Sequence, residues 1–411
     1  MAPFETFGTT RDLYFTGSDA NRLKHVCPES FGGGPIDDVR TRGVAVDRFI
    51  HRDLLNGLDL PLPASVQQRT GVPGALPMWV FGDPDAAANR DQFPGPLIRS
   101  VQGEVLHLTA SCKGGTHTIH WHGIEPTPMN DGVGKHSFEV AGNFVHQLQT
   151  NEAGTYFYHC HKNTTLHFEM GLFGLFIVDP VSPDPGITAP YLSPPGFVAG
   201  RLTTDPPNVE TIRYDVEKFW VADDFDSRWH FPEPGHNHGM QDCDADTPFA
   251  PETFHVFGTE AFELNDFRAD IFNVSGVVLD YGQTGPPFTP VFTGAIADPL
   301  IAVNAAVGET VLIRFLNAGY GIQELTMPVD ITIIAWDGHP LGVGDLHRYS
   351  RPYLVPAGTP IRTTSARRFD LIIDTATTGQ FAGNARIDYY EWVKGVPNGL
   401  IASVSIPVNI G

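Results

Sequence analysis

The stretch from Tyr156 to Gly174, YFYHCHKNTTLHFEMGLFG, constrains the fold of this chain more than any other part of the sequence. It places one cysteine directly between two histidines, and it adds a third histidine and a methionine further along. A second histidine-rich segment, HTIHWHG, begins upstream at His117. Cysteine, histidine and methionine side chains are the soft and borderline ligands of transition metals. We therefore expect the two segments to be neighbouring strands that present their ligands together.

Strand periodicity sorts these side chains onto two faces. Side chains at positions i and i+2 of a strand share a face, and the side chain at i+1 points the opposite way. The two histidines that flank the cysteine therefore share one face, and the cysteine points to the other. In the upstream segment the first histidine lies an odd step from the next two. The sequence predicts one face with His117, Cys160, His167 and Met170, and another with His120, His122, His159 and His161.

Each face predicts a metal site. One cysteine thiolate, two imidazoles and a weak thioether form the ligand set of a blue (type 1) copper site. In that site Cys160 would carry electrons, His117 and His167 would complete the plane, and Met170 would be the axial ligand. The four imidazoles of the other face predict a second copper site. A His-x-His pair alone is more often surface or core decoration, but two such pairs beside a Cys-His-Met set favour metal binding.

These residues resemble the multicopper oxidase family of cupredoxin proteins, which includes laccases. The resemblance is motif-specific from Phe93 to Pro180, through FPGPLIRSVQGEVLHLTAS, HWHGIEPTPMNDGV and the Gly-Thr-Tyr approach to the cysteine. It implies copper as the cofactor and Cys160, His159 and His161 as the electron path to dioxygen. A cysteine in the first domain is similar to some two-domain multicopper oxidases and to nitrite reductase, whereas three-domain laccases carry it in their last domain.

The length of 411 residues suggests two or three domains, and 43 glycines and 35 prolines separate short apolar runs that are typical of β-sandwiches. With the resemblance, the sequence predicts an all-β chain of two cupredoxin-like Greek-key β-sandwich domains. Residues 52–75 are expected to form a loop or short helix. The expected organisation is an irregular N-terminal extension over 1–40, a blue-copper domain over 41–180, an extended Pro-rich linker over 181–212 and a second domain over 213–411.

The second domain resembles the copper-free middle domain of a laccase, in segments such as VNAAVGETVLIRFLNAGYG and AWDGHPL. Where copper ligands would fall it has residues 321–324 (GIQE) and 389–392 (YYEW), so no blue copper is expected there. An oxidase cluster would need further imidazoles, and in two-domain relatives a neighbouring subunit of a trimer donates them. We therefore expect a homotrimer or other homo-oligomer. The pair His236 and His238 is more typical of a solvated loop, and His339 of a structural turn.

Three functions follow from these residues. The first is a laccase-like oxidase that takes electrons from a small-molecule or metal-ion donor and reduces dioxygen. The second is a nitrite-reductase-like trimer, which is weakened because His120 stands where that family has an acid–base aspartate and Trp392 where the neighbour's copper histidine would align. The third is an electron-transfer or copper-binding protein in which only the blue site is loaded.

The remaining composition limits partners and location. A formal net charge of −21 argues against nucleic-acid binding, because phosphates attract a basic surface. The sequence has no apolar run long enough to span a membrane. The start, MAPFETFGTT, lacks the apolar core of a signal peptide, but copper oxidases work outside the reducing cytosol, so a periplasmic or extracellular location is expected. One disulfide is plausible there, with three possible pairings among Cys27, Cys112 and Cys243.

Overall fold

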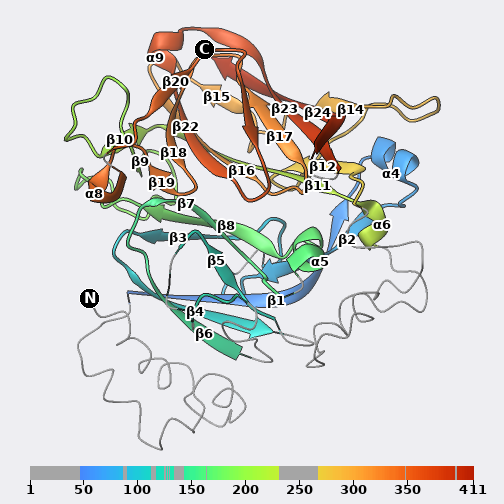
Figure 1. Ribbon diagram of the computed structural model, residues 1–411, viewed down its shortest axis with the longest axis horizontal. Coiled ribbons are helices and arrows are strands. Elements are labelled where there is room, and N and C mark those ends of the chain that lie inside the picture. The colour runs from blue at the N-terminus through green and yellow to red at the C-terminus, as the bar shows by residue number, and fades with distance from the viewer. Residues whose placement is uncertain are drawn as a thin grey trace, which may run out of the picture.

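The computed structural model shows the all-β chain that the sequence predicts, with strands stacked in two β-sandwiches and only short helices between them (Figure 1). The predicted N-terminal extension, Cys27 and Cys243 lie outside the part of the chain that the structure describes. That part comprises residues 47–86, 90–112, 117–124, 126, 128, 130–133, 143–162, 164–230, 267–347, 349–393 and 396–411.

The first sandwich consists of two four-stranded sheets, with strand orders β2-β1-β4-β6 and β3-β8-β7-β5. Each sheet contains one parallel pair, β1 with β4 and β3 with β8, beside antiparallel neighbours. Side chains such as Leu106, Trp121 and Phe176 fill the space between the sheets and are fully buried. The strands are β1 (Arg48–Pro61), β2 (Ala75–Gly82), β3 (Gly95–Val101), β4 (Val105–Cys112), β5 (His120–His122), β6 (Asn143–Gln149), β7 (Gly154–His159) and β8 (Phe173–Asp179).

The segment that was expected to be a loop or short helix is only partly so. Helix α4 (Ala64–Thr70) is present, but β1 continues as a strand to Pro61. The far half of β1 pairs with β2, where Pro61 lies opposite Ala75. A bulge between Asp53 and Asn56 bends the strand. The sequence prediction was wrong for 52–61 because strand pairing with β2 overrides the charged and glycine residues that read locally as a loop.

The sequence predicted an extended Pro-rich linker over 181–212. The structure instead has a β-hairpin in the second half of this segment. Strand β9 (Gly196–Ala199) pairs with β10 (Thr211–Tyr214) as an antiparallel hairpin. Val198, Ile212 and Tyr214 are buried in one cluster with Leu312 and Ile334 of the second sandwich. Alternating apolar residues within the proline-rich stretch therefore attach the second half of this segment to the sandwich that follows it.

The second sandwich is larger. Its eight-stranded sheet runs β13-β12-β11-β16-β22-β18-β19, with β20 paired to β18, and its six-stranded sheet runs β14-β24-β23-β17-β21, with β15 paired to β24. The first sheet contains β11 (Val216–Phe225), β12 (Ile271–Val274), β13 (Val277–Val278), β16 (Thr310–Asn317), β18 (Ile331–Trp336), β19 (His339–Pro340), β20 (Tyr353–Val355) and β22 (Arg368–Asp374). The second contains β14 (Phe292–Ala295), β15 (Val303–Ala305), β17 (Ile322–Thr326), β21 (Pro360–Thr363), β23 (Phe381–Val393) and β24 (Val396–Ile410).

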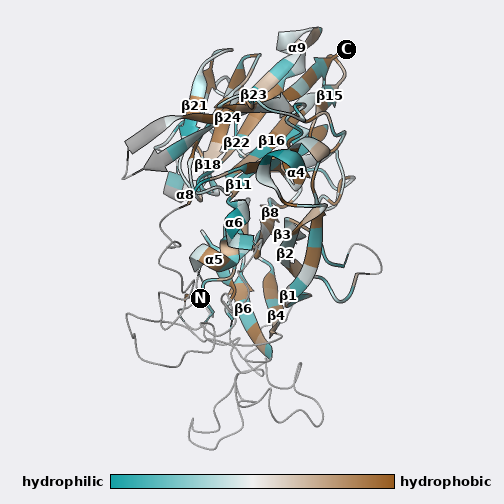
Figure 2. Cartoon of the chain, turned by 90° about the vertical axis from the view of Figure 1, so that its right-hand side faces the viewer, coloured by the Kyte–Doolittle hydropathy of each residue, from teal (hydrophilic) through white to brown (hydrophobic). Residues whose placement is uncertain are grey.

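One apolar cluster of the second sandwich extends across the boundary to the first. Val66 of α4 and Met78 of β2 belong to the same buried cluster as Phe225 and Phe272 of the second sandwich. In Figure 2 the brown, hydrophobic residues accordingly lie along the strands of both halves. The short helices at the edges of the sandwiches are α5 (Thr164–Glu169), α6 (Ser227–His230), α8 (Gly344–His347) and α9 (Thr375–Thr378).

A buried charged network crosses the same boundary. Arg99 of β3 pairs with Asp179 at the end of β8 and with Glu217 of β11, at 2.8 and 2.7 Å. Arg314 of β16 approaches the same Glu217 at 2.7 Å. These side chains are at most 5% exposed, so the charges are compensated by one another rather than by water. Packing and charge together fix the second sandwich relative to the first.

Candidate metal centres

The loop after β7 carries the cysteine and is closed by its own backbone. Strand β7 ends at His159, so the strand predicted to reach His161 is shorter than expected. The Cys160 amide donates to the Leu172 carbonyl at 3.1 Å, and the Leu172 amide donates to the His167 carbonyl at 2.9 Å. Between them lies α5, which contributes His167 to the inside of the loop. The loop is thus fixed before any ligand binds.

Gly171 makes this closure possible. Its φ of +104° lies in the left-handed region, which side chains with a Cβ rarely adopt. A Cβ there would also lie 2.8 Å from the Met78 Cε atom and 3.1 Å from the Trp79 carbonyl oxygen. The Trp79 amide donates to the Met170 carbonyl at 2.7 Å, so the glycine lets the loop pack directly on β2.

The structure brings together three of the four residues of the predicted blue-copper face, His117, Cys160 and His167. The Cys160 Sγ atom lies 3.1 Å from His167 Nδ1 and 3.6 Å from His117 Nδ1, and all three side chains are buried. Met170 is buried beside Leu166 and Trp79. The Trp79 ring packs edge-on to the His167 ring at 5.8 Å. One sulfur and two imidazole nitrogens therefore converge at a site that excludes water.

The predicted imidazole face is also assembled. Strands β5 and β7 pair so that His120 lies directly opposite His159. The His120 ring lies 5.4 Å from that of His122 and 5.3 Å from those of His159 and His161. All four line an open pocket of about 270 Å³. The other residues that line it are Phe157, Thr164, Thr165, Phe168, Tyr320, Ser365 and Ala366.

Neighbouring groups orient these imidazoles. His120 Nδ1 hydrogen-bonds the Asp131 carbonyl at 2.8 Å, and His159 Nδ1 hydrogen-bonds the Cys160 carbonyl at 2.9 Å. A hydrogen bond from one ring nitrogen to a carbonyl is the usual way to fix the tautomer that leaves the other nitrogen for a metal. His122 stacks on Phe157 at 4.3 Å, and its Nδ1 lies 3.4 Å from His159 Nε2. The nitrogens therefore face one another across a small space.

Burial lowers the pKa of four of these imidazoles and so favours their neutral form, which is the form that binds metals. Desolvation, with smaller effects from Arg368, His120 and His161, lowers the pKa of His122 to about 3. Burial also holds the pKa of His159 well below its usual value, and it lowers the pKa of His161. In the first cluster, burial holds the pKa of His167 well below its ordinary range, with a contribution from His117. Both clusters are therefore ready to accept a cation at neutral pH.

The second sandwich brings no histidine to this pocket among the residues that the structure describes. Its contributions are Tyr320, Ser365 and Ala366. His230 is buried elsewhere, where its Nδ1 contacts the Pro77 carbonyl at 2.8 Å and its Nε2 lies 3.3 Å from Glu169. The pair His236 and His238 lies outside the described residues, as does His255.

One group of ligand-type side chains was missed by the sequence analysis. His339, which was expected to be a structural turn residue, lies with His347 beside Glu152 of the first sandwich. No sequence signal could have found this group, because Glu152 and His339 are 187 residues apart and lie in different sandwiches.

Comparisons with known proteins agree with this geometry. Residues 84–183 match the family model described as multicopper oxidase. The chain is 33% identical over 351 residues to copper resistance protein A of Pseudomonas syringae pv. tomato, covering 80% of this chain and 50% of that protein. The chain therefore contains a multicopper oxidase domain and is homologous to members of that family. The matched segment contains both clusters, so the resemblance stated from its motifs is confirmed.

Other relatives extend the comparison. L-ascorbate oxidase of Cucumis sativus is 34% identical over 116 residues, which cover 25% of this chain and 19% of that enzyme. The chain thus spans half or less of the length of these curated relatives. Among solved structures, the multicopper oxidase mgLAC matches with a TM-score of 0.51 at 19% identity, over 88% of this chain and 86% of that one. Blue copper oxidase from Nitrosomonas europaea matches with a TM-score of 0.51 at 18% identity, over 87% and 86%. At these identities the structural likeness concerns the fold.

Copper, the metal of this family, fits the residues that are present. A cysteine sulfur close to two imidazole Nδ1 atoms, with a buried methionine on the same loop, matches the donor set of a type 1 copper ion. Four imidazoles around one pocket suit copper equally well. Among the described residues, no helix is both long and apolar enough to cross a membrane.

Proposed function

We propose that this chain is a laccase-like, copper-dependent oxidoreductase that passes electrons from a reducing substrate to dioxygen. Its ligands would be His117, Cys160, His167 and Met170 at a type 1 copper, and His120, His122, His159 and His161 at a second copper site. Copper bound at these sites would supply the one-electron redox chemistry. The protein supplies the ligands, their orientation and the path between the two sites.

One observation carries this proposal, which is the covalent continuity between the two clusters. Cys160 belongs to the first cluster, and its two sequence neighbours, His159 and His161, line the pocket of the second. The hydrogen bond from His159 Nδ1 to the Cys160 carbonyl adds a second short connection of 2.9 Å. A protein that only stored copper would not need its two sites joined through consecutive residues. The arrangement supports electron transfer from one site to the other.

The open pocket supports self-association. Its four imidazoles all come from the first sandwich, and its remaining described walls are apolar or hydroxyl-bearing side chains. A second copper site that reduces dioxygen would need further ligands, which a neighbouring copy of the chain could bring. We therefore propose a homotrimer or other homo-oligomer, with a small-molecule or metal-ion electron donor. A periplasmic or extracellular location goes with this proposal, because copper oxidases work outside the reducing cytosol.

A second candidate function follows if the second copper site lacks those further ligands. If no further imidazoles reach the pocket, only the first site would hold copper firmly, and the chain would be an electron-transfer or copper-binding protein. The absence of a second-sandwich histidine from the described part of the pocket favours this alternative. Its distinguishing feature would be blue colour without oxygen consumption.

Copper content and oxygen consumption together test the proposal. The full chain would be loaded with copper and analysed for metal per chain, for intense visible absorption and for oxygen uptake with a phenolic donor. An oxidase should bind several copper ions per chain and consume oxygen at a rate that depends on the donor. One copper per chain, with blue colour and no oxygen uptake, would overturn the oxidase proposal and leave the electron-transfer function.

A further inference from the structure

A third group of metal-ligand side chains lies between the two sandwiches, away from both copper clusters. Glu152 is in the turn between β6 and β7, His339 is in β19, and His347 ends α8. Glu152 Oε2 lies 3.0 Å from His339 Nδ1, and Glu152 Oε1 lies 2.5 Å from His347 Nε2. The two imidazole rings are 4.7 Å apart. One atom from each residue lies within 4.8 Å of the other two.

We propose that Glu152, His339 and His347 form a binding site for a divalent transition-metal ion such as zinc. Two imidazoles and one carboxylate are a ligand set of zinc sites that keep an open position, and they also suit other divalent first-row ions. Ligand atoms about 2.0–2.2 Å from such an ion would lie about 3.4 Å from one another. The two carboxylate–imidazole separations, 3.0 and 2.5 Å, are shorter than that value, so side-chain rotations that open them slightly would complete the site.

A single carboxylate faces both histidine rings and turns a different oxygen toward each of them. All three side chains are half-buried, with 44%, 28% and 23% exposure for His339, Glu152 and His347. An ion from solution can reach half-buried ligands, and these ligands still hold it partly away from bulk water.

The backbone beneath the site is held rigidly. Gly154 and Gly338 approach so closely that a Cβ on Gly154 would collide with the Gly338 carbonyl. The Tyr156 hydroxyl lies 3.2 Å from both the Gly338 and Glu152 carbonyl oxygens and joins the two segments. His339 follows Gly338 directly, so its position relative to Glu152 is fixed across the domain boundary. This preorganisation lowers the entropic cost of bringing three ligands together.

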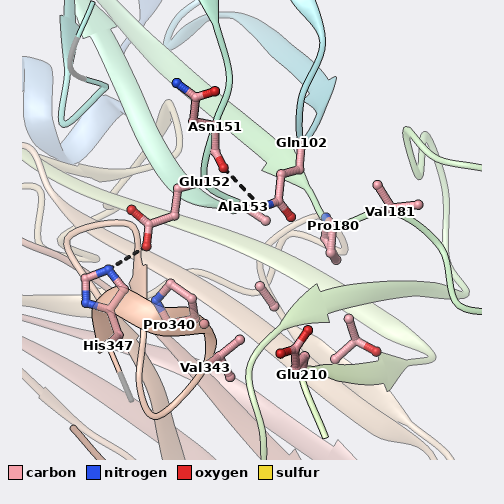
Figure 3. Close-up of a pocket in the computed structure, with 13 residues that line it drawn as sticks. Gln102, Asn151, Glu152, Ala153, Pro180, Val181, Glu210, Pro340, Val343 and His347 are labelled. Atoms are coloured by element: carbon pink, nitrogen blue, oxygen red, sulfur yellow. Dashed lines mark hydrogen bonds and ion pairs between the residues drawn. The ribbon is translucent and has the colours of Figure 1, made fainter. Parts of the chain in front are cut away.

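The site opens onto a cavity of about 390 Å³ between the sandwiches. Figure 3 shows Glu152 and His347 pointing toward one another at one end of this cavity, with Glu210 and Val343 further along its wall. An ion held by three protein ligands would thus keep one coordination position for water or a small anionic group. Because its ligands come from both sandwiches, the ion would also join them.

Total metal content tests the proposal. The full chain would be loaded with copper, saturated with Zn²⁺, freed of loose metal on a desalting column and analysed for copper plus zinc. Glu152→Gln, which keeps the side chain's shape, and His347→Ala should each bind one metal ion fewer per chain than the wild type. Glu210→Gln is the matched control, because it removes a carboxylate from the same cavity without removing a ligand.

Thermal unfolding gives a second readout. Zn²⁺ should raise the unfolding midpoint of the wild type and of Glu210→Gln, but not that of Glu152→Gln or His347→Ala, because only a folded site binds the ion. Equal metal content in all four proteins, with equal Zn²⁺ effects on the midpoint, would overturn the site. This outcome is independent of the oxidase proposal, because colour and oxygen uptake depend on the other two clusters.

Discussion

His120 lies directly opposite His159 in the antiparallel pair of β5 and β7, with their rings 5.3 Å apart. This register puts two imidazoles from segments almost forty residues apart beside the same pocket. It also leaves Cys160, the next residue along the chain, to face His117 and His167. One strand pairing therefore builds both clusters at once.

The sulfur of Cys160 should determine the visible colour of the copper-loaded chain. Cys160→Ser should abolish the intense visible absorption of the copper-loaded chain, because a hydroxyl does not give the thiolate charge transfer of a blue site. Met170→Leu should keep the colour and raise the reduction potential, because a weak axial ligand is lost. Absorption spectra and redox titration would measure both effects. A blue Cys160→Ser protein would show that the cysteine is not the ligand.

The imidazole pocket should affect oxygen uptake more than colour. His122 lines this pocket and belongs to the imidazole cluster rather than to the cluster of Cys160. His122→Ala should therefore keep the visible absorption while oxygen uptake falls by more than about a hundredfold, since losing even an outer partner of a metal ligand costs roughly 10–100-fold. Oxygen-electrode rates at matched absorbance would measure this. Unchanged uptake would contradict the assignment of the second copper site.

Gly171 should be intolerant of a side chain. Gly171→Ala would force a Cβ into a left-handed backbone and against Met78, so it should destabilise the fold by about 1–3 kcal/mol and weaken copper loading. Gly285→Ala is the control, because that glycine has open space around it and no positive φ. Urea denaturation of both variants would test this. Equal stability would mean that the loop after Cys160 adjusts without cost.

The charged network between the sandwiches should be sensitive to loss of its central carboxylate. Glu217→Gln would leave Arg99 and Arg314 buried without their shared partner, at a cost of about 3–5 kcal/mol in the free energy of unfolding. Glu104→Gln breaks a more exposed pair with Arg48 and should cost less than about 1 kcal/mol. Denaturant midpoints would compare them. Similar costs would show that burial does not strengthen the Glu217 contacts.

Asp223 should make stability depend on pH. Burial, with the nearby charge of Asp224, holds the pKa of Asp223 well above its usual value. The folded state therefore prefers the protonated acid, and this component of stability is present at low pH and is lost as the pH rises toward the folded-state pKa. Asp223→Asn, which can still accept the bond from the Asp224 amide, should lose less stability than the wild type between pH 5 and pH 8. Denaturation curves at pH 5 and pH 8 would measure this, and an equal loss of stability in Asp223→Asn and the wild type would contradict the prediction.

The sequence alone predicted the two ligand faces because they depend on local geometry. Consecutive residues at the end of a strand point to opposite sides, so His159, Cys160 and His161 must serve two clusters wherever the strand is packed. Local periodicity follows from backbone geometry, so it can be recognised in a sequence without knowing which strand is the partner.

The long strand β1, the β9–β10 hairpin and the walls of the imidazole pocket were decided by tertiary structure. Strand β1 exists beyond residue 51 because β2 pairs with it, and Tyr320 reaches the pocket because the second sandwich docks on the first. The group of Glu152, His339 and His347 depends on the same docking. The sequence by itself determined which residues alternate along each strand. The placement of one sandwich on the other decided which distant side chains meet, because that placement depends on packing and charge spread over the whole interface.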